Sequence, residues 1–145
     1  MNAKEKILLK LKYLQKYTEF LNKYKDIVKN KLEEDYILKS AIERNLQLAL
    51  ESVIDISEVI ISEENLRKPE EYKETITLLV ELKILTDKFA KKFAPAMGLR
   101  NILVHQYTKI DINKLHKHLK EDLEDFNTFA KAIIKYLEKN KKNNK

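Results

Sequence analysis

The stretch IERNLQLALESVIDISEVII, from Ile42 to Ile61, repeats apolar residues at the three- and four-residue spacing of an α-helix. Its apolar face contains Ile42, Leu46, Ala49, Val53, Ile56 and Ile60. The opposite face contains Glu43, Arg44, Gln47, Glu51, Asp55 and Glu58. We expect this polar face to be solvated; the alternative is that Arg44, Gln47 and Glu51 line a cleft or a subunit contact. With Asn30 as a candidate N-cap, the helix is predicted from about Asn30 to Ile61, unless its length makes it kink or begin later.

Helical spacing continues on both sides of this segment. A first helix is predicted from Lys4 to Val28. Its apolar positions are Ile7, Leu8, Leu11, Leu14, Tyr17, Phe20, Leu21, Tyr24, Ile27 and Val28. After the connector SEENLRKP, at residues 62–69, a third helix is predicted from Pro69, at its first position, to about Leu82.

Two capping signals mark the remaining helices. Thr86 is the predicted N-cap of a fourth helix, which Pro95 and Gly98 are expected to interrupt or bend. Asp111 is the predicted N-cap of a final helix that extends to about Leu137. Its predicted apolar stripe contains Ile112, Leu115, Leu119, Leu123, Phe126, Phe129, Ile133, Ile134 and Leu137. The chain therefore contains about five predicted amphipathic helices.

The composition agrees with an all-α protein. The 145 residues include one Gly and two Pro, with 43% hydrophobic and 36% charged residues, and no segment alternates as a strand would. We predict an up-and-down helical bundle forming a single domain over residues 1–138, followed by a basic, frayed tail at residues 139–145. The apolar faces exceed what one small bundle buries, which favours a dimer.

Charge and cysteine content restrict the function further. Residues 135–145 hold five lysines and one glutamate, so four of the six net positive charges lie in the tail and the body is nearly balanced. Such a tail is typical of a solvated end; the alternative is an arm that binds phosphates. The absence of Cys, of a signal-peptide pattern and of an apolar run of about 20 residues favours a cytoplasmic protein without a membrane span.

Several kinds of site are excluded by the residues present. A phosphate-binding or dinucleotide-binding loop needs several glycines, and the chain has one. His116 and His118 stand two positions apart on the last helix, without a third group at metal-ligand spacing, so we expect exposed histidines. No metal site and no cofactor is predicted.

The segment RNILVHQY, from Arg100 to Tyr107, gathers side chains suited to phosphodiester chemistry. Arg100 offers a forked, permanently charged donor for a phosphate or for the dianionic phosphorane formed when a phosphodiester is attacked. His105 titrates near neutrality and can transfer protons to or from ribose oxygens. Asn101 can orient the histidine or bind a phosphate oxygen, and Tyr107 can position the phosphate or stack on a base.

Helical geometry limits how one copy of this segment would work. At about 100° per residue, Asn101 and His105 share a helix face, whereas Arg100 and His105 lie about 140° apart. Arg100 must therefore reach from a helix start after Gly98, or a second subunit must contribute. Acid–base cleavage also needs two proton-transfer groups, and a two-fold dimer would supply two histidines.

A structural interpretation competes with the catalytic one. Leu103 and Val104 would pack in the core, Arg100 would form an ion pair, and His105 and Tyr107 would lie at the edge of the helix. From the residues alone, this interpretation stands slightly ahead.

The ordered pattern across the chain changes this balance. R-N-x-L-V-H-x-Y resembles the R-x4-H-x-Y signature of the HEPN ribonuclease toxins, specifically of their HepT-like branch. Ile42 to Ile61 is similar to that branch's second-helix pattern. The branch's middle segment is also similar to P-x-x-Y-x-E, at Pro69 to Glu74, followed by LLVELKIL and the approach to GLRN. The start of the last helix resembles the branch too, so the likeness covers about Lys29 to Leu137.

This resemblance implies an all-helical HEPN fold, usually dimeric, and a metal-independent RNA endonuclease that leaves a 2′,3′-cyclic phosphate. Arg100 and His105 match the catalytic positions, and Asn101 matches the polar residue beside the arginine. The implied partner is a minimal nucleotidyltransferase antitoxin, which would attach AMP to Tyr107. The alternative is a non-catalytic helical subunit that binds a nucleotidyltransferase or presents a nucleotide to it.

Overall fold

The chain forms a bundle of helices in the computed structural model, which describes residues 1–105 and 110–143, with side chains through residue 140. The helices are α1 (Ala3–Asn22), α2 (Lys29–Glu34), α3 (Tyr36–Glu63), α4 (Tyr72–Glu81), α5 (Asp87–Val104) and α6 (Ile112–Asn143). No strand occurs within these described ranges. The predicted all-α class is confirmed, and the short helix α2 is an addition to the five expected.

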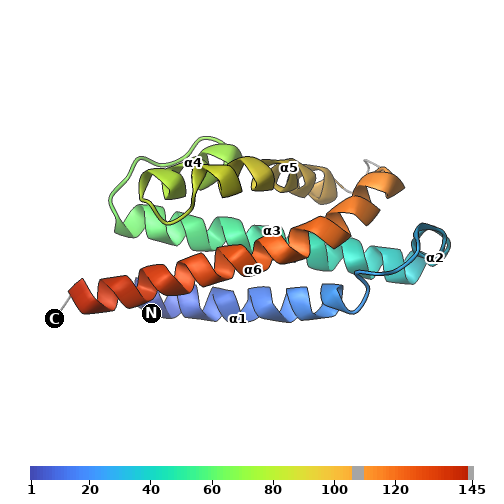
Figure 1. Ribbon diagram of the computed structural model, residues 1–145, viewed down its shortest axis with the longest axis horizontal. Helices are drawn as coiled ribbons and strands as arrows, with labels where there is room; N and C mark the ends of the chain where they lie inside the picture. The colour runs from blue at the N-terminus through green and yellow to red at the C-terminus, as the bar shows by residue number, and fades with distance from the viewer. Residues whose placement is uncertain (106–109, 144–145) are drawn as a thin grey trace.

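Helix α3 is the centre of the bundle, because it packs against each of the other five helices. In Figure 1, α4 and α5 lie along one side of α3, while α1 and α6 lie along the other. The buried residues of α3 include Ile42, Leu46, Ala49, Leu50, Val53, Ile54, Ile56, Ile60 and Ile61. They extend beyond one stripe, which explains how α3 contacts helices on both sides.

The N-terminal half differs from the sequence-based prediction at its helix ends. Helix α1 ends at Asn22, six residues before the predicted end at Val28, and Val28 is exposed. The candidate cap Asn30 lies inside α2, and the predicted alternative that the long helix begins later is confirmed, because α3 begins at Tyr36. Asp35 caps α3 instead, because its carboxylate accepts a hydrogen bond from the Leu38 amide at 3.0 Å.

The connector between α3 and α4 is shifted by two residues relative to the prediction and spans residues 64–71. Helix α4 begins at Tyr72, three residues after the expected start at Pro69. Arg67 pairs with Glu74 at 3.0 Å and with Glu81 at 3.1 Å, so the connector is tied to the surface of α4. These contacts stabilise a non-helical conformation of residues 64–71. The local preference of Pro69 for the first position of a helix did not predict it.

The caps of the last two helices agree with the prediction. The Thr86 hydroxyl accepts a hydrogen bond from the Phe89 amide at 3.1 Å, and the Asp111 carboxylate accepts one from the Asn113 amide at 2.8 Å. Helix α5, however, continues through Pro95 and Gly98 to Val104, so the predicted interruption there is wrong. Four core side chains around that point hold the helix in place: Phe93, Ala96, Met97 and Leu99.

Most of the predicted apolar stripe of α6 closes the bundle, and its buried members include Leu115, Leu119, Phe126, Phe129 and Ile133. Ile134, which was also predicted on this stripe, is 46% exposed. The two histidines of α6 are half-buried, which corrects the expectation that they are exposed. His116 Nε2 lies 2.8 Å from the Ile27 carbonyl oxygen, and His118 Nδ1 lies 3.0 Å from the Asp122 carboxylate. The helix continues to Asn143, and the division of the chain at residue 138 stays a prediction.

Burial raises the pKa of the Asp122 carboxyl group, although the hydrogen bond with His118 opposes this shift. The folded chain therefore binds the Asp122 proton more tightly than the unfolded chain does. The folded chain therefore loses stability as the pH rises from the pKa of Asp122 in the unfolded chain through its raised pKa in the folded chain. We expect Asp122→Asn to increase the free energy of unfolding at pH 7, measured by urea denaturation.

At about pH 3, where the carboxyl group is protonated in both states, the gain from Asp122→Asn is expected to disappear. Asp26→Asn, at an exposed position, is the control and should leave the unfolding free energy nearly unchanged at both pH values. A lower stability of Asp122→Asn at pH 7 would contradict this account of the buried carboxylate.

Candidate active site

The described residues of the predicted motif lie at the C-terminal end of α5. Arg100 and Asn101 belong to the last turns of the helix, and His105 is the residue that ends it, with φ −84° and ψ 88°. Arg100 is half-buried, whereas Asn101 and His105 are exposed. Tyr107, the predicted AMP acceptor, lies outside the described residues.

The unbroken α5 excludes one of the two predicted routes by which Arg100 would reach His105. Arg100 stands inside a helix and not at a helix start after Gly98, so that expectation was wrong. Helical geometry also fixes the side-chain directions only as far as Val104, because His105 has non-helical backbone angles. Participation of a second subunit stays a prediction.

Arg100 is held against α3 by Glu51. Its Nη2 atom lies 3.6 Å from Glu51 Oε1, and the two side chains are 20% and 30% exposed. Gln47, one turn earlier on α3, donates a hydrogen bond to the same carboxylate oxygen at 3.0 Å. The carboxylate is therefore fixed from its own helix while it faces the guanidinium group.

Tyr72 and Asn101 complete the surroundings of Arg100. The guanidinium carbon lies 4.5 Å from the centre of the Tyr72 ring, within the range of a cation–π contact. Asn101 Oδ1 accepts a long hydrogen bond of 3.4 Å from Arg100 Nη1. Arg100 Nε is buried with no hydrogen-bond partner in the described part of the chain, a situation that costs about 1–3 kcal/mol. Stability alone therefore does not explain why an arginine stands here.

Sequence reasoning missed Glu51 and Tyr72 as partners of Arg100. Glu51 was assigned to a solvated face, but it is half-buried and faces α5. The pair Gln47 and Glu51, one helical turn apart, was the available signal, because a hydrogen-bonded pair of this kind can position a carboxylate. Nothing local in the sequence connects either partner to Arg100.

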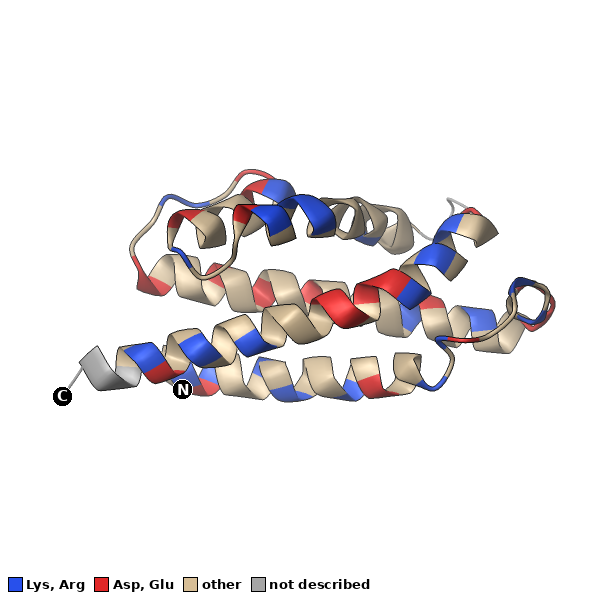
Figure 2. Ribbon diagram, viewed as in Figure 1, with Lys and Arg blue, Asp and Glu red and all other residues tan. Residues whose placement is uncertain are grey.

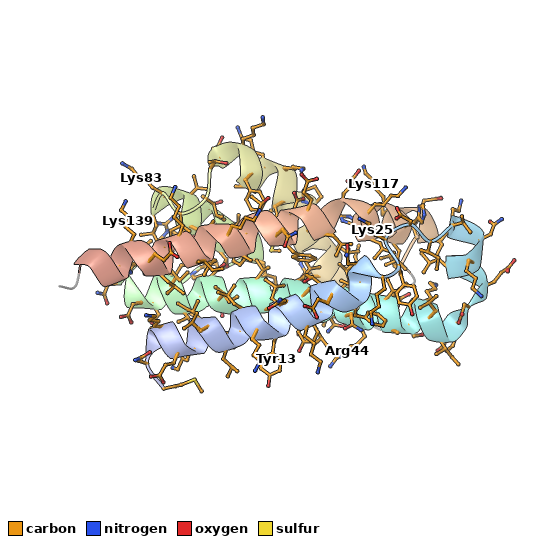
Figure 3. All side chains as sticks on the ribbon, turned by 60° about the horizontal axis from the view of Figure 1, so that its bottom comes forward. Tyr13, Lys25, Arg44, Lys83, Lys117 and Lys139 are labelled. Atoms are coloured by element: carbon orange, nitrogen blue, oxygen red, sulfur yellow. The ribbon has the colours of Figure 1, made fainter. Side chains whose placement is uncertain are left out.

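Positive charge is distributed over several of the described elements. In Figure 2, Lys and Arg residues alternate with Asp and Glu along most helices. Figure 3 shows Lys25, Lys83, Lys117 and Lys139 projecting outward from four different parts of the chain. Because charges of both signs are mixed along the described helices, we expect a specific phosphate contact to come from single residues such as Arg100.

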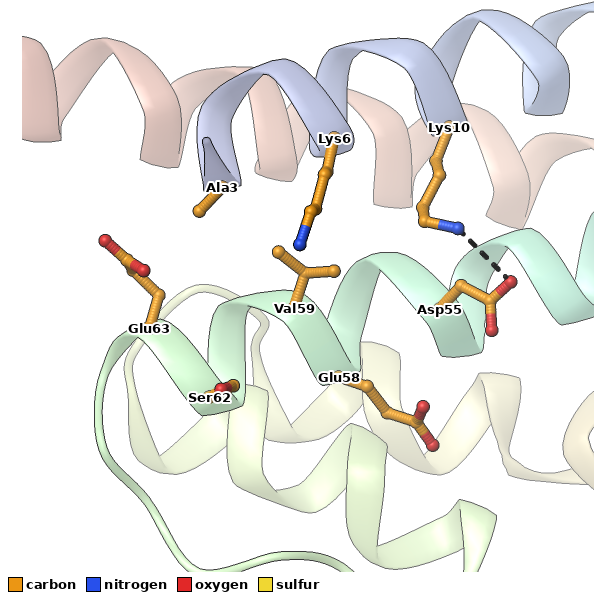
Figure 4. A pocket seen from close by; sticks show the side chains of 8 residues that line it. All are labelled: Ala3, Lys6, Lys10, Asp55, Glu58, Val59, Ser62 and Glu63. Atoms are coloured by element: carbon orange, nitrogen blue, oxygen red, sulfur yellow. Dashed lines mark ion pairs between the residues drawn. The ribbon is translucent and has the colours of Figure 1, made fainter. Parts of the chain in front are cut away.

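A hollow of about 460 Å³ lies between α1 and α3, and none of its lining residues belongs to the motif. Figure 4 shows Lys6 and Lys10 of α1 facing α3, with an ion pair of 3.5 Å between Lys10 and Asp55. Lysines and carboxylates that neutralise one another are typical of a solvated helix contact. The arrangement at Arg100 is a better candidate for chemistry.

Metal and membrane sites are not evident in the described residues. No group of three His, Asp or Glu side chains there is placed to hold a metal ion. Within the same ranges, no helix combines the length and apolarity that crossing a membrane requires.

The amino-acid sequence matches the family model "Ribonuclease HepT-like" over residues 11–133. The tRNA nuclease HepT of Aphanizomenon flos-aquae is 31% identical over 128 residues, which cover 88% of this chain and 87% of that protein. The mRNA nuclease HepT of Shewanella oneidensis is 29% identical over 104 residues, or 72% of this chain and 78% of that one.

The fold matches solved structures of the same kind. The tri-AMPylated HEPN toxin of Shewanella oneidensis, solved in complex with its MNT antitoxin, superimposes with a TM-score of 0.80 and 26% sequence identity. The superposition covers 92% of this chain and 98% of that toxin. The HEPN type of helical fold, which the sequence pattern implied, is confirmed.

The contact between Glu51 and Arg100 is expected to be measurable in a double-mutant cycle. Glu51→Gln and Arg100→Gln, combined, should give a coupling free energy of about 1 kcal/mol in urea denaturation, because the pair is half-buried and its carboxylate is fixed. The matched control is the ion pair between Asp87 and Lys91, whose side chains are 70% and 79% exposed. Equal coupling energies for the two pairs would show that Glu51 does not fix Arg100.

Proposed function

Because the chain belongs to the HepT-like family of ribonucleases, we propose that it is a metal-independent RNA endonuclease and the toxin of a toxin–antitoxin pair in the cytoplasm. One observation supports the proposal most strongly: Arg100 is half-buried and held by Glu51 and Tyr72, near the end of α5, which His105 terminates. Relatives described as tRNA and mRNA nucleases support RNA as the substrate class.

Each residue of the motif has a defined role in this proposal. The ribose 2′-oxygen attacks the adjacent phosphorus atom while His105 removes its proton, and the bond to the 5′-oxygen breaks. A second histidine donates a proton to the leaving 5′-oxygen. Arg100 stabilises the dianionic phosphorane, and Asn101, which contacts Arg100, is the supporting residue that positions the phosphate. The products are a 2′,3′-cyclic phosphate and a 5′-hydroxyl group.

A two-fold dimer would supply the second histidine. One chain has one histidine in the motif, and His116 and His118 are occupied by contacts with Ile27 and Asp122. Two motifs that face each other across a two-fold axis would place one His105 on each side of the phosphate. We therefore propose that the active form is a homodimer or a higher even oligomer.

The ion pair with Glu51 favours a second candidate function. Within one chain, Glu51 compensates the charge of Arg100, which weakens its attraction for a phosphate. A non-catalytic subunit that binds a nucleotidyltransferase, or presents a nucleotide to it, would have no need of a strong phosphate contact. If the chain is such a non-catalytic subunit, it should form a stable complex with the nucleotidyltransferase and should not cleave RNA. A cleavage assay therefore separates the two functions.

Tyr107 is the proposed switch of the toxin. The phenol oxygen of Tyr107 would attack the α-phosphorus of ATP on the antitoxin, with pyrophosphate as the leaving group. The attached AMP adds bulk and negative charge two residues from His105, where an RNA phosphate should bind. The tri-AMPylated toxin from Shewanella oneidensis supports this kind of regulation.

RNA cleavage in the presence of EDTA tests the catalytic roles. We expect the parent protein to cleave, and we expect His105→Ala and Arg100→Ala each to reduce the rate constant about 100-fold or more. Arg44→Ala, which removes an exposed arginine of α3, is the matched control and should cleave like the parent. Unchanged rates for both motif variants, or a need for divalent metal, would refute the mechanism.

Mass spectrometry of the protein co-expressed with its nucleotidyltransferase tests the switch. We expect a mass increase of one or more adenylyl groups, located by peptide mapping at Tyr107, and its loss in Tyr107→Phe. Tyr36→Phe is the control, because Tyr36 is 80% exposed and would be the easier target of an unselective enzyme. Modification that persists in Tyr107→Phe would exclude Tyr107 as the acceptor.

A further inference from the structure

A groove opens directly beside Arg100, between the start of α4 and the middle of α5. Its volume is about 520 Å³, with residues 70–73 on one wall and Met97, Gly98 and Asn101 on the other. Tyr72 and Asn101 line this groove and also contact the Arg100 guanidinium group. Arg100 itself does not line the groove, but these shared contacts place it next to the groove.

Gly98, the single glycine of the sequence, stands in the floor of the groove. Its φ is not positive, so its backbone conformation does not require glycine. A Cβ atom at this position would meet no heavy atom within 4 Å, so packing within the chain does not require it either. Glycine inside a helix lowers stability relative to alanine. Glycine at position 98 therefore keeps this part of the groove open, because the side chain of any other residue would begin to fill it.

The walls of the groove suit a nucleobase better than a phosphate. Three charged residues line the groove, all of them exposed: Glu70, Glu71 and Lys73. The two carboxylates outnumber the one ammonium group, which disfavours a phosphate, and they can accept hydrogen bonds from the amino and imino groups of bases. The Asn101 amide can both donate and accept, and the Tyr72 ring offers an aromatic surface. Arg100 supplies the positive charge for the neighbouring phosphate.

A second copy of the chain is the competing occupant. Tight packing of a helix against Gly98 would need an apolar surface, as in the core of a protein interface. The groove offers mainly polar side chains, and its most apolar residue, Met97, is only 1% exposed. The lining therefore favours a polar, planar ligand.

We propose that this groove is a nucleobase subsite: when an RNA phosphate lies at Arg100, the adjacent base enters the space above Gly98. The inference rests on the proposed ribonuclease function and adds a determinant of the sequence that is cut. It predicts that filling the groove alters substrate binding and base preference, while the catalytic groups stay in place.

Gly98→Leu fills the groove, and Gly98→Ala is its matched control with the same gain in helix propensity. We expect Gly98→Leu to raise the KM for RNA cleavage about tenfold, with a small change in kcat, and to change the bases found beside the cut when product ends are sequenced. Gly98→Ala adds only one methyl group to the groove and should raise the KM clearly less than Gly98→Leu does. Thermal unfolding, expected at or above the parent midpoint for both variants, verifies that they fold.

Binding of a non-cleavable 2′-O-methyl trinucleotide separates a failure of the subsite from a failure of the proposed function. About tenfold weaker binding to Gly98→Leu than to Gly98→Ala supports the subsite, even if the parent cleaves no RNA. Equal binding together with equal base preference would overturn it, and so would loss of the oligomer in Gly98→Leu alone during sedimentation. Glu71→Gln, at an exposed position, is a second variant that should change base preference if Gly98→Leu does not fold.

Discussion

Helix α3 is buried on both sides, and this constraint determines the arrangement of the candidate active site. Because α3 packs against every other helix, its register relative to α5 is fixed by core residues on both helices. That register places Glu51 opposite Arg100, although the two residues lie far apart in the sequence. The hydrogen bond from Gln47 then orients the carboxylate, and the ring of Tyr72 supports the guanidinium group from α4.

The resulting arrangement favours function over stability. An exposed ion pair would leave Arg100 mobile, and an apolar side chain in its place would avoid the buried, unpaired Nε atom. Holding the guanidinium group in one orientation instead prepares it to meet developing charge, since less reorganisation is needed when a phosphodiester is attacked. Under the proposed function, Glu51 would act as a positioning residue for Arg100, and its negative charge would weaken the attraction of Arg100 for any phosphate.

Much of the fold could be predicted from local signals, and the site only in part. The apolar stripes of α3 and α6 and the caps at Thr86 and Asp111 were predicted correctly, because each depends on residues within a few positions. The helix ends near Asn22 and Tyr72 and the continuity of α5 at Pro95 depend on tertiary contacts, which override local breakers. For the same reason the motif was visible in the sequence, while its partners on α3 and α4 were not.

We propose above all that the residues at this helix end catalyse attack of the RNA 2′-hydroxyl group on the adjacent phosphorus atom without a metal ion. Analysis of the RNA ends produced in EDTA tests that claim most directly, because the chemistry of the ends records which oxygen attacked phosphorus. A 2′,3′-cyclic phosphate paired with a 5′-hydroxyl group is the predicted result. Ends with a 3′-hydroxyl and a 5′-phosphate would mean that water was the nucleophile, and would contradict the roles given to Arg100 and His105.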